Sequence, residues 1–347
     1  MERRLSRRGV VSGAGAKALG ALALTLAALP SRRALAADFY RGKTITLIVG
    51  FAPGGGVDTQ ARTIARHLVR FIPGQPGVIV QNMEGAAGAL ATNFLNQRVA
   101  PDGLTISTPG RSWFVEGVVK GPGIGFDPTR FTYIGSAGGS NSVAYVRAAT
   151  GIKSLDDLKS SRQTVTFGSL ASTTPTAMVP LMLAGLGMPI KVVVGYVSTA
   201  RVLVALEQGE VDAVFTVSDS FARRQDLIAN RIVVPILQSK PGLPDLPLVR
   251  DVLPPREGPL LTLVMGTDSF GLPLVGPPGV APELTEILRK AFLDMVADKD
   301  YQADAVKADL PVGAPLDGAQ LSAMINELAA SATPEIVAAY RRLAASK

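Results

Sequence analysis

A chain of 347 residues with 47% hydrophobic side chains, one His and no Cys is long enough for two domains with sizeable cores. Its formal net charge of +7 is concentrated at one end, because residues 1–37 carry seven basic residues and one acidic residue, which leaves 28 basic against 27 acidic in the rest. A remainder near +1 lacks the clustered Lys and Arg that bind phosphate backbones, so composition excludes nucleic acid as a partner.

Residues 1–37 have the organisation of an export signal. Arginines 3, 4, 7 and 8 precede the apolar run Ala18–Leu29, and Ala34-Leu35-Ala36 supplies the small-x-small pattern of a cleavage site. The apolar run is about 12 residues long, fewer than the ~20 that a membrane-spanning helix needs. The stretch Ser6–Val11 fits either a twin-arginine signal or an ordinary secretory signal. Both routes lead out of the cytoplasm.

Short β-branched runs then alternate with amphipathic stretches. The pattern predicts strands at Thr44–Val49, Val78–Asn82 and Thr105–Thr108, and helices at Asp58–Phe71 and Ala86–Gln97. This alternation predicts an α/β fold with a mostly parallel sheet.

A second α/β series follows a crossover. Two strand-like runs within 131–147 flank the loop "SAGGSNS", which has the composition of a connection between domains. Beyond it, strands are predicted at Thr164–Gly168, Lys191–Val194 and Asp212–Val217, and helices at Thr174–Leu186 and Thr199–Gln208.

The last third of the chain is rich in proline and then helical. Prolines in Ser239–Pro259 exclude a continuous helix and favour an extended segment. Residues 270–284, "FGLPLVGPPGVAPEL", read as one more strand and a helix entered through Pro282. The tail is predicted to be helical, with a break at 309–318.

Three consecutive glycines, Gly54-Gly55-Gly56, stand between the first predicted strand and helix. Unpaired backbone N–H groups at a helix start can hold an anion, and Asp58 or Thr59 is available as the helix cap. A nucleotide phosphate is excluded, because Val57 and Asp58 stand where a Walker loop has Lys and Ser or Thr, and the dinucleotide spacing is absent. A sharp turn without any ligand is the alternative explanation.

Two further small-residue loops follow predicted strands, "NMEGAAGAL" (82–90) and "FGSLASTT" (167–174). Ligands of open α/β sheets bind beyond the carboxyl ends of the strands, where such loops gather. Helix starts facing a ligand from two domains would suit a small dianion or a ligand with two carboxylates.

Several stretches carry a family resemblance: "KTITLIVGFAPGGGVDTQAR", "VIVQNMEGAAGA", "APDGLTI", "GEVDAVF" and "GLPLVGPPGVAPELTEIL". In this order they resemble the Bug/TctC-type periplasmic receptors of tripartite tricarboxylate transporters. The resemblance implies a two-domain, type II periplasmic-binding-protein-like α/β fold with a cleft and a hinge. It also implies a discontinuous first domain, 38–137 plus 268–347, a second domain, 138–267, and the signal peptide at 1–37.

The function implied by the resemblance is capture of a small organic carboxylate, a di- or tricarboxylate or an aromatic acid, and its transfer to membrane transporter subunits. We expect a periplasmic monomer without cofactor or metal. The ligand carboxylate would be held by backbone amides of the first domain, with the second domain closing over the rest. The expected ligand-binding residues are Phe51, Ala52, Gly55, Gly56, Asp58, Gly85, Ala86, Arg111, Ser169, Ser172, Thr173, Tyr196 and Asp219.

The chain departs from the family pattern where the far end of the ligand would be recognised. The segment that usually reads like "VPYKG" is Val194-Gly195-Tyr196-Val197-Ser198, which keeps the Tyr but not the Lys-Gly. The second loop has "MEGAAG" in place of an Arg-Pro-Gly-Ala-Gly type sequence, and "TPGRSW" after the third strand is also unusual. Arg111 could replace the missing Lys by pairing with a carboxylate, and Trp113 could offer a ring, or both could be a surface Arg beside a partly buried Trp.

An enzyme would need reactive groups that the sequence does not assemble, because it has no Cys, no metal-ligand cluster and no nucleophile elbow. We therefore expect no enzymatic activity, and a hydrolase-type enzyme is the weaker alternative. His67 is expected on a solvated helix face beside Arg66 and Arg70. Asp58 and Asp219 could meet as a carboxylate pair, although a helix cap explains Asp58 more simply. A sensor that reports its ligand to a membrane kinase remains the main alternative to transport.

Overall fold

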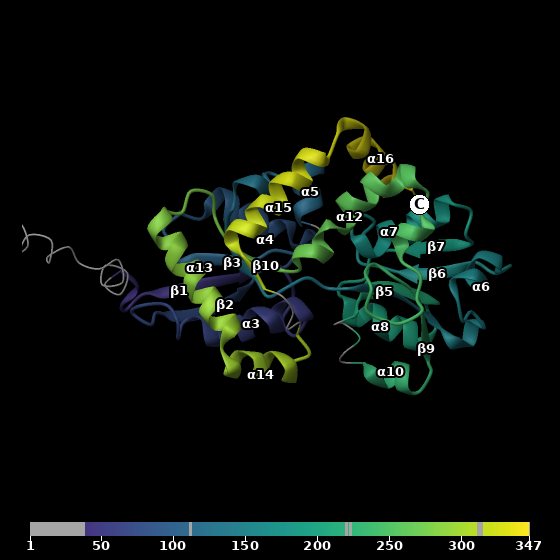
Figure 1. The fold of residues 1–347 in the computed structure, drawn as a ribbon, viewed down its shortest axis with the longest axis horizontal. Coiled ribbons are helices and arrows are strands. Elements are labelled where there is room, and N and C mark those ends of the chain that lie inside the picture. Colours follow the sequence, from purple (N-terminus) through teal and green to yellow (C-terminus); the bar gives the residue numbers. More distant parts are fainter. Residues whose placement is uncertain (1–38, 111–112, 219–220, 222–223, 311–314, 347) are drawn as a thin grey trace, which may run out of the picture.

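The computed structural model describes residues 39–346 except 111–112, 219–220, 222–223 and 311–314. Two β-sheets form the centres of two lobes that lie side by side (Figure 1). Among the described residues, no helix combines the length and the apolar character needed to cross a bilayer. The predicted signal peptide and the sites predicted at Arg111 and Asp219 lie outside the described residues.

The first lobe is built on a six-stranded sheet in the order β11-β4-β10-β3-β1-β2. β1 pairs in parallel with β2 and β3, whereas β10 runs antiparallel to both β3 and β4, and β11 runs antiparallel to β4. The strands are β1 (Thr44–Val49), β2 (Gly77–Asn82), β3 (Thr105–Thr108), β4 (Thr132–Ser136), β10 (Pro273–Gly276) and β11 (Leu316–Asp317). The helices are α3 (Gly56–Leu68), α4 (Ala89–Arg98), α5 (Trp113–Val119), α13 (Pro282–Ala297), α14 (Lys299–Lys307), α15 (Gly318–Ser331) and α16 (Pro334–Ala345).

The second lobe is built on a five-stranded sheet in the order β7-β6-β8-β5-β9. β6 pairs in parallel with β7 and β8, and β5 runs antiparallel to β8 and β9. The strands are β5 (Ser142–Arg147), β6 (Val165–Gly168), β7 (Ile190–Val193), β8 (Ala213–Val217) and β9 (Val233–Gln238). The helices are α6 (Leu155–Ser160), α7 (Pro175–Gly185), α8 (Thr199–Gln208), α10 (Gln225–Ala229), α11 (Val249–Val252) and α12 (Gly258–Phe270).

The predicted strands β1, β2 and β3 pair in parallel as expected, and further strands make both sheets mixed. Each lobe has a parallel part from its own βαβ units, and the strand that enters each lobe from the other, β5 or β10, runs antiparallel to its neighbours. The alternation of local patterns gives the strands but not the direction of a strand that returns from the other lobe.

Periodicity explains which faces are buried. In α3 the apolar residues Ala61, Ile64, Ala65 and Leu68 recur at helical spacing and are all buried. In β5, residues 142–146 are buried on both faces, as expected for a strand that has helices on either side.

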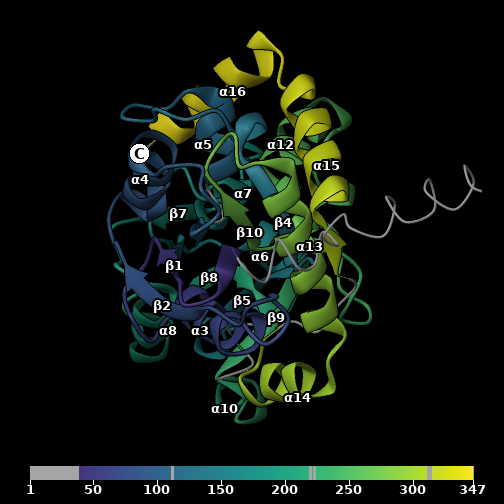
Figure 2. The same cartoon turned by 90° about the vertical axis from the view of Figure 1, so that its left-hand side faces the viewer.

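The two lobes share one hydrophobic core around helix α12. Residues of α5, α7, α12 and α15 belong to the same cluster, with Phe114, Met178, Val264 and Leu321 as members from each helix. The C-terminal helix α16 packs against α7, α5 and α12, and its end lies over the second lobe in Figure 1. Figure 2 faces the first lobe and shows α13 running beside β10 and β4.

Candidate functional site

Three loops of the first lobe meet beyond the carboxyl ends of β1, β2 and β3, and glycines set their separation. A Cβ added at Gly50 would lie 2.9 Å from the Cα of Gly88, and one at Gly88 would lie 3.3 Å from the N of Gly110 and from Cε2 of Phe51. Contacts this short leave no room for side chains, so the loops after the three strands are held against each other.

The glycine loop, residues 50–56, contains two kinds of glycine. Gly54 has a φ of +83°, where a side chain would be strained, so the turn itself explains it. Gly55 has a φ of −75°, and its added Cβ would meet nothing nearer than the O of Ala52 at 3.7 Å. A Cβ at Gly56 would meet no atom of the described residues within 4 Å. The fold therefore does not require glycine at 55 or 56.

The start of α3 presents backbone donors at these two glycines. The helix begins at Gly56 with Gly55 as its N-cap residue, and no side chain caps it. The first N–H groups of a helix have no acceptor within the helix, and the helix dipole favours an anion near them. The interpretation of Asp58 or Thr59 as the cap is wrong, since both lie inside the first turn.

Asp58 instead fixes the loop from within. Asp58 is 2% exposed. Its Oδ2 accepts hydrogen bonds from the N–H of Gly54 (2.8 Å) and from Nε of Arg62 (2.9 Å). Its Oδ1 accepts a hydrogen bond from Nδ2 of Asn82 (2.8 Å). Burial acts to raise the pKa of Asp58, but the hydrogen bonds from Arg62, Gly54 and Asn82 outweigh it and hold the pKa below its ordinary value. Asn82 also donates to the O of Phe51 (2.8 Å), so it joins the end of β2 to the loop.

Thr108, the last residue of β3, carries a hydroxyl that the sequence did not single out. It is 0% exposed, and its Oγ1 has no hydrogen-bond partner among the described residues. It pairs in register with Val49, directly before the glycine loop. Leaving a buried polar group unpaired costs about 1–3 kcal/mol, so a partner supplied by a ligand or by water would explain it. The sequence signal that could have found it is a Thr at the inner end of a buried strand.

The second loop has a strained backbone beside its exposed residues. Gly85 has a φ of +143° and Ala86 a φ of +46°, which is unusual for a residue with a side chain. Both are exposed. Such strain clusters at functional sites, and it is compatible with the expectation that this loop contacts a ligand.

In the second lobe, hydroxyls gather where β6 meets α7. Ser169 Oγ lies 3.0 Å from Thr174 Oγ1 and 2.6 Å from Thr176 Oγ1, and the two threonine hydroxyls lie 2.8 Å apart. Ser169 is 1% exposed, whereas Ser172 and Thr173 are half-buried. Thr174 and Thr176 were not among the expected residues.

The C-terminal helix reaches this loop. The hydroxyl of Tyr340 lies 2.9 Å from the O of Thr173 and 3.1 Å from Glu116 Oε1 on α5. Burial, with the nearby charge of Glu116, raises the pKa of Tyr340 well above its usual value, so the hydroxyl remains a donor. One side chain therefore connects α16 to both lobes.

Trp113, a possible ligand contact or a partly buried residue, and His67, expected on a solvated helix face, are both buried. Trp113 is 2% exposed, and its ring packs 5.7 Å from Phe131 and 6.2 Å from Tyr133, between ring centroids. This places the ring in the core and not at a surface that a ligand reaches. The expectation of a solvated face for His67 is wrong, because His67 is 7% exposed and its Nε2 lies 3.0 Å from Asp304 Oδ2 on α14.

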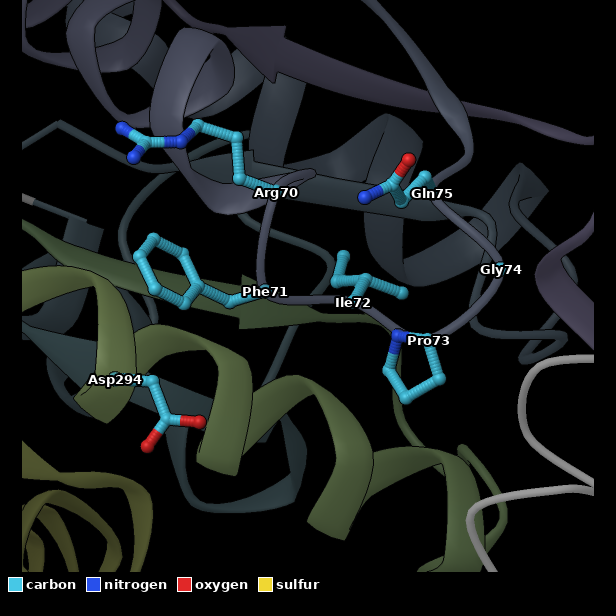
Figure 3. A pocket seen from close by; sticks show the side chains of 7 residues that line it. All are labelled: Arg70, Phe71, Ile72, Pro73, Gly74, Gln75 and Asp294. Atoms are coloured by element: carbon cyan, nitrogen blue, oxygen red, sulfur yellow. The ribbon is translucent and has the colours of Figure 1, made fainter.

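Two surface hollows lie away from these loops. One, of about 450 Å³, is lined by Arg70, Phe71, Ile72, Pro73, Gly74, Gln75 and Asp294 (Figure 3). It lies at the end of α3 opposite to the glycine loop, about 20 Å away by helix rise. The other, of about 300 Å³, is lined by residues of β4, α13 and α15, such as Tyr133 and Arg289. Within the described residues, no group of three or more His, Cys, Asp or Glu could hold a metal ion.

A protein-family model matches residues 132–310, which is more than half of the chain. Its description is "ABC transporter, phosphonate, periplasmic substrate-binding protein". Among curated proteins, a UPF0065 protein of Cupriavidus necator is 38% identical over 103 residues, which are 30% of each chain. The protein BugT of Bordetella pertussis is 43% identical over 72 residues, which are 21% of each chain. The matched segments thus span less than a third of these two relatives.

Solved structures share the fold over most of the chain. The periplasmic binding protein BugD has a TM-score of 0.67 at 18% identity and covers 88% of this chain and 98% of its own. MatC from Rhodopseudomonas palustris with bound malate has a TM-score of 0.64 at 19% identity, with coverage of 87% and 99%. An R. palustris protein with adipate has a TM-score of 0.65 at 18% identity, with coverage of 87% and 96%. The expected two-domain periplasmic-binding-protein fold and the resemblance to the Bug/TctC type are confirmed.

Proposed function

This chain belongs to the periplasmic substrate-binding proteins, and from this premise we propose that it captures a small organic carboxylate between its two lobes and delivers it to a tripartite membrane transporter. Its homologues are substrate-binding proteins of transport systems, so it is a binding protein and not an enzyme. Residues 1–37 would direct its export, by the twin-arginine or the ordinary secretory route.

The observation that carries this proposal is the unobstructed backbone at Gly55 and Gly56. Neither position needs glycine for its φ or for its internal contacts. Close approach of a ligand to the backbone is the remaining reason for two consecutive residues without side chains. The donors at the start of α3 suit a carboxylate, and the buried, unpartnered hydroxyl of Thr108 lies at the same edge of the sheet. Malate and adipate bound to proteins of the same fold support this ligand class.

The proposed contacts divide between the lobes. The first lobe offers the amides of 55 and 56, the loop at 85–86 and Thr108, with Arg111 as a further candidate outside the described residues. We assign Asp58 to holding the loop and not to contacting the ligand, because both of its carboxylate oxygens already accept hydrogen bonds. The second lobe offers the loops of Ser172, Thr173 and Tyr196.

A phosphonate is the second candidate ligand, because the matching family model describes a phosphonate-binding protein. Backbone donors at a helix start and a cluster of hydroxyls also suit a tetrahedral anion. Residues 50–57, 83–88, 169–174 and 194–198 contain no Lys or Arg, so Arg111 is the one cationic side chain among the proposed contacts, which disfavours this doubly charged group.

Thermal-shift measurements test the ligand class directly. The parent protein is heated with mono-, di- and tricarboxylates, aromatic acids and methylphosphonate. A ligand at 100 times its Kd stabilises the folded state by about 2.7 kcal/mol, and we expect a carboxylate to do so and to reduce the radius of gyration in solution scattering. Stabilisation by methylphosphonate alone, or by nothing in the panel, would refute the proposal. Reconstitution with the membrane subunits then separates transport from sensing.

A further inference from the structure

The loop after β7, residues 194–198, forms the outer wall of the second-lobe site. Gly195 N–H donates to the O of Leu170 (3.0 Å) and Tyr196 N–H to the O of Ser169 (3.4 Å). A Cβ at Gly168 would lie 3.5 Å from Cε2 of Tyr196. The loop is therefore joined to the segment that leads from β6 into α7, and the two present one surface.

The side chains on this wall are apolar and open to solvent. Val197 is 80% exposed and Val194 is 48% exposed. Single exposed apolar residues need no explanation, but these two flank Tyr196 on one short loop next to the site.

The wall also lacks a cationic side chain that could pair with a second charge. Residues 169–174 and 194–198 contain no Lys or Arg. The hydroxyls of Ser169, Thr174 and Thr176 already contact each other, and that of Thr174 also donates to the O of Ala171 (2.7 Å). A carboxylate enclosed against Val194 and Val197 would lose its hydration without gaining a cationic partner.

Building on the carboxylate site described above, we propose that the far end of the ligand is apolar, so that this receptor selects monocarboxylates with an aliphatic or aromatic body over dicarboxylates of the same size. The single carboxylate binds the backbone donors of the first lobe. Val194 and Val197 contact the apolar body when the lobes close. Val197 disfavours binding of a ligand with a second carboxylate.

Two matched ligand pairs test this specificity by isothermal titration calorimetry: hexanoate against adipate, and 4-methylbenzoate against terephthalate. In each pair a methyl group of the monocarboxylate is replaced by the second carboxylate. The variant Val197→Lys adds a cation to the wall. Val306→Lys is the matched control, because Val306 is also exposed (63%) but lies on α14 of the first lobe.

The parent protein should bind the monocarboxylate of at least one pair tenfold or more tightly than its dicarboxylate. Val197→Lys should shift that ratio at least tenfold toward the dicarboxylate, and Val306→Lys should leave it unchanged. Tighter binding of the dicarboxylates by the parent, or an unchanged ratio in Val197→Lys, would overturn the specificity while leaving the carboxylate function intact. Failure of all four ligands, where another carboxylate of the wider panel binds, would also overturn it. Only failure of every carboxylate would overturn the function itself.

Discussion

Substitution of Gly54, Gly55 and Gly56 one at a time should separate the glycine that the fold requires from the glycines that ligand binding requires. At Gly56 an added Cβ meets nothing within 4 Å, and a Gly→Ala change at a compatible φ stabilises by about 0.4–1 kcal/mol through the unfolded chain. For lobes of this size that is a rise in Tm of roughly 1–4 °C. At Gly54, where φ is +83°, the same change should instead cost about 1–2 kcal/mol.

The effect of these substitutions on ligand affinity should differ from their effect on stability. The bulkier Gly55→Val and Gly56→Val should keep a cooperative unfolding transition and lose the contact to the amides, which for a charge-assisted hydrogen bond is about 1.5–3 kcal/mol, or roughly 10- to 150-fold in Kd. Differential scanning calorimetry without ligand and titration calorimetry with ligand measure the two effects. Unchanged affinity in both valine variants would show that the glycines only form a turn. A lower Tm for Gly56→Ala would refute the geometric argument.

Four further variants test single contacts. Thr108→Val should leave the free energy of unfolding without ligand unchanged or raise it, because it removes a buried unpaired hydroxyl, and it should weaken binding; a loss of stability without ligand would contradict this. Asp58→Asn should flatten the acid limb of a stability–pH profile, since the lowered pKa of Asp58 stabilises the fold above about pH 4 and that contribution is lost as the pH falls through the folded pKa. Gly50→Ala should cost about 1–3 kcal/mol in urea denaturation, because the new Cβ would lie 2.9 Å from the Cα of Gly88. Arg111→Ala should cost about 1.5–3 kcal/mol of ligand affinity if its guanidinium pairs with the carboxylate, and retained affinity would remove it from the site.

The sequence predicted local elements well where a strand or helix has a clear period and a clear end. The predicted bounds of Thr44–Val49, Thr105–Thr108 and Thr199–Gln208 are those of β1, β3 and α8. Helix α12 was not predicted, because it follows a Pro-rich segment and is apolar on most sides, so it has no amphipathic signal. Strand β9 was also missed, and its antiparallel pairing with β5 depends on contacts far apart in the chain.

The site could be predicted only as a set of loops. Glycine patterns located the meeting point of the loops, but they could not show that Gly54 is needed by the turn while Gly55 and Gly56 are free of internal constraint. That difference depends on φ and on neighbouring atoms. The partners of Asp58 could not be predicted either, because Asn82 is brought to it by strand pairing.

The position of β10 has a consequence for the order in which the protein folds. β10 lies between β3 and β4, so the centre of the first sheet is missing until residues 273–276 have been synthesised. The second sheet consists of strands that follow each other without interruption from 142 to 238. The second lobe, although synthesised later, can therefore fold before the first lobe, because β3 and β4 have no strand between them until β10 is present. Long-range pairing of this kind folds slowly, so the first lobe completes its structure last.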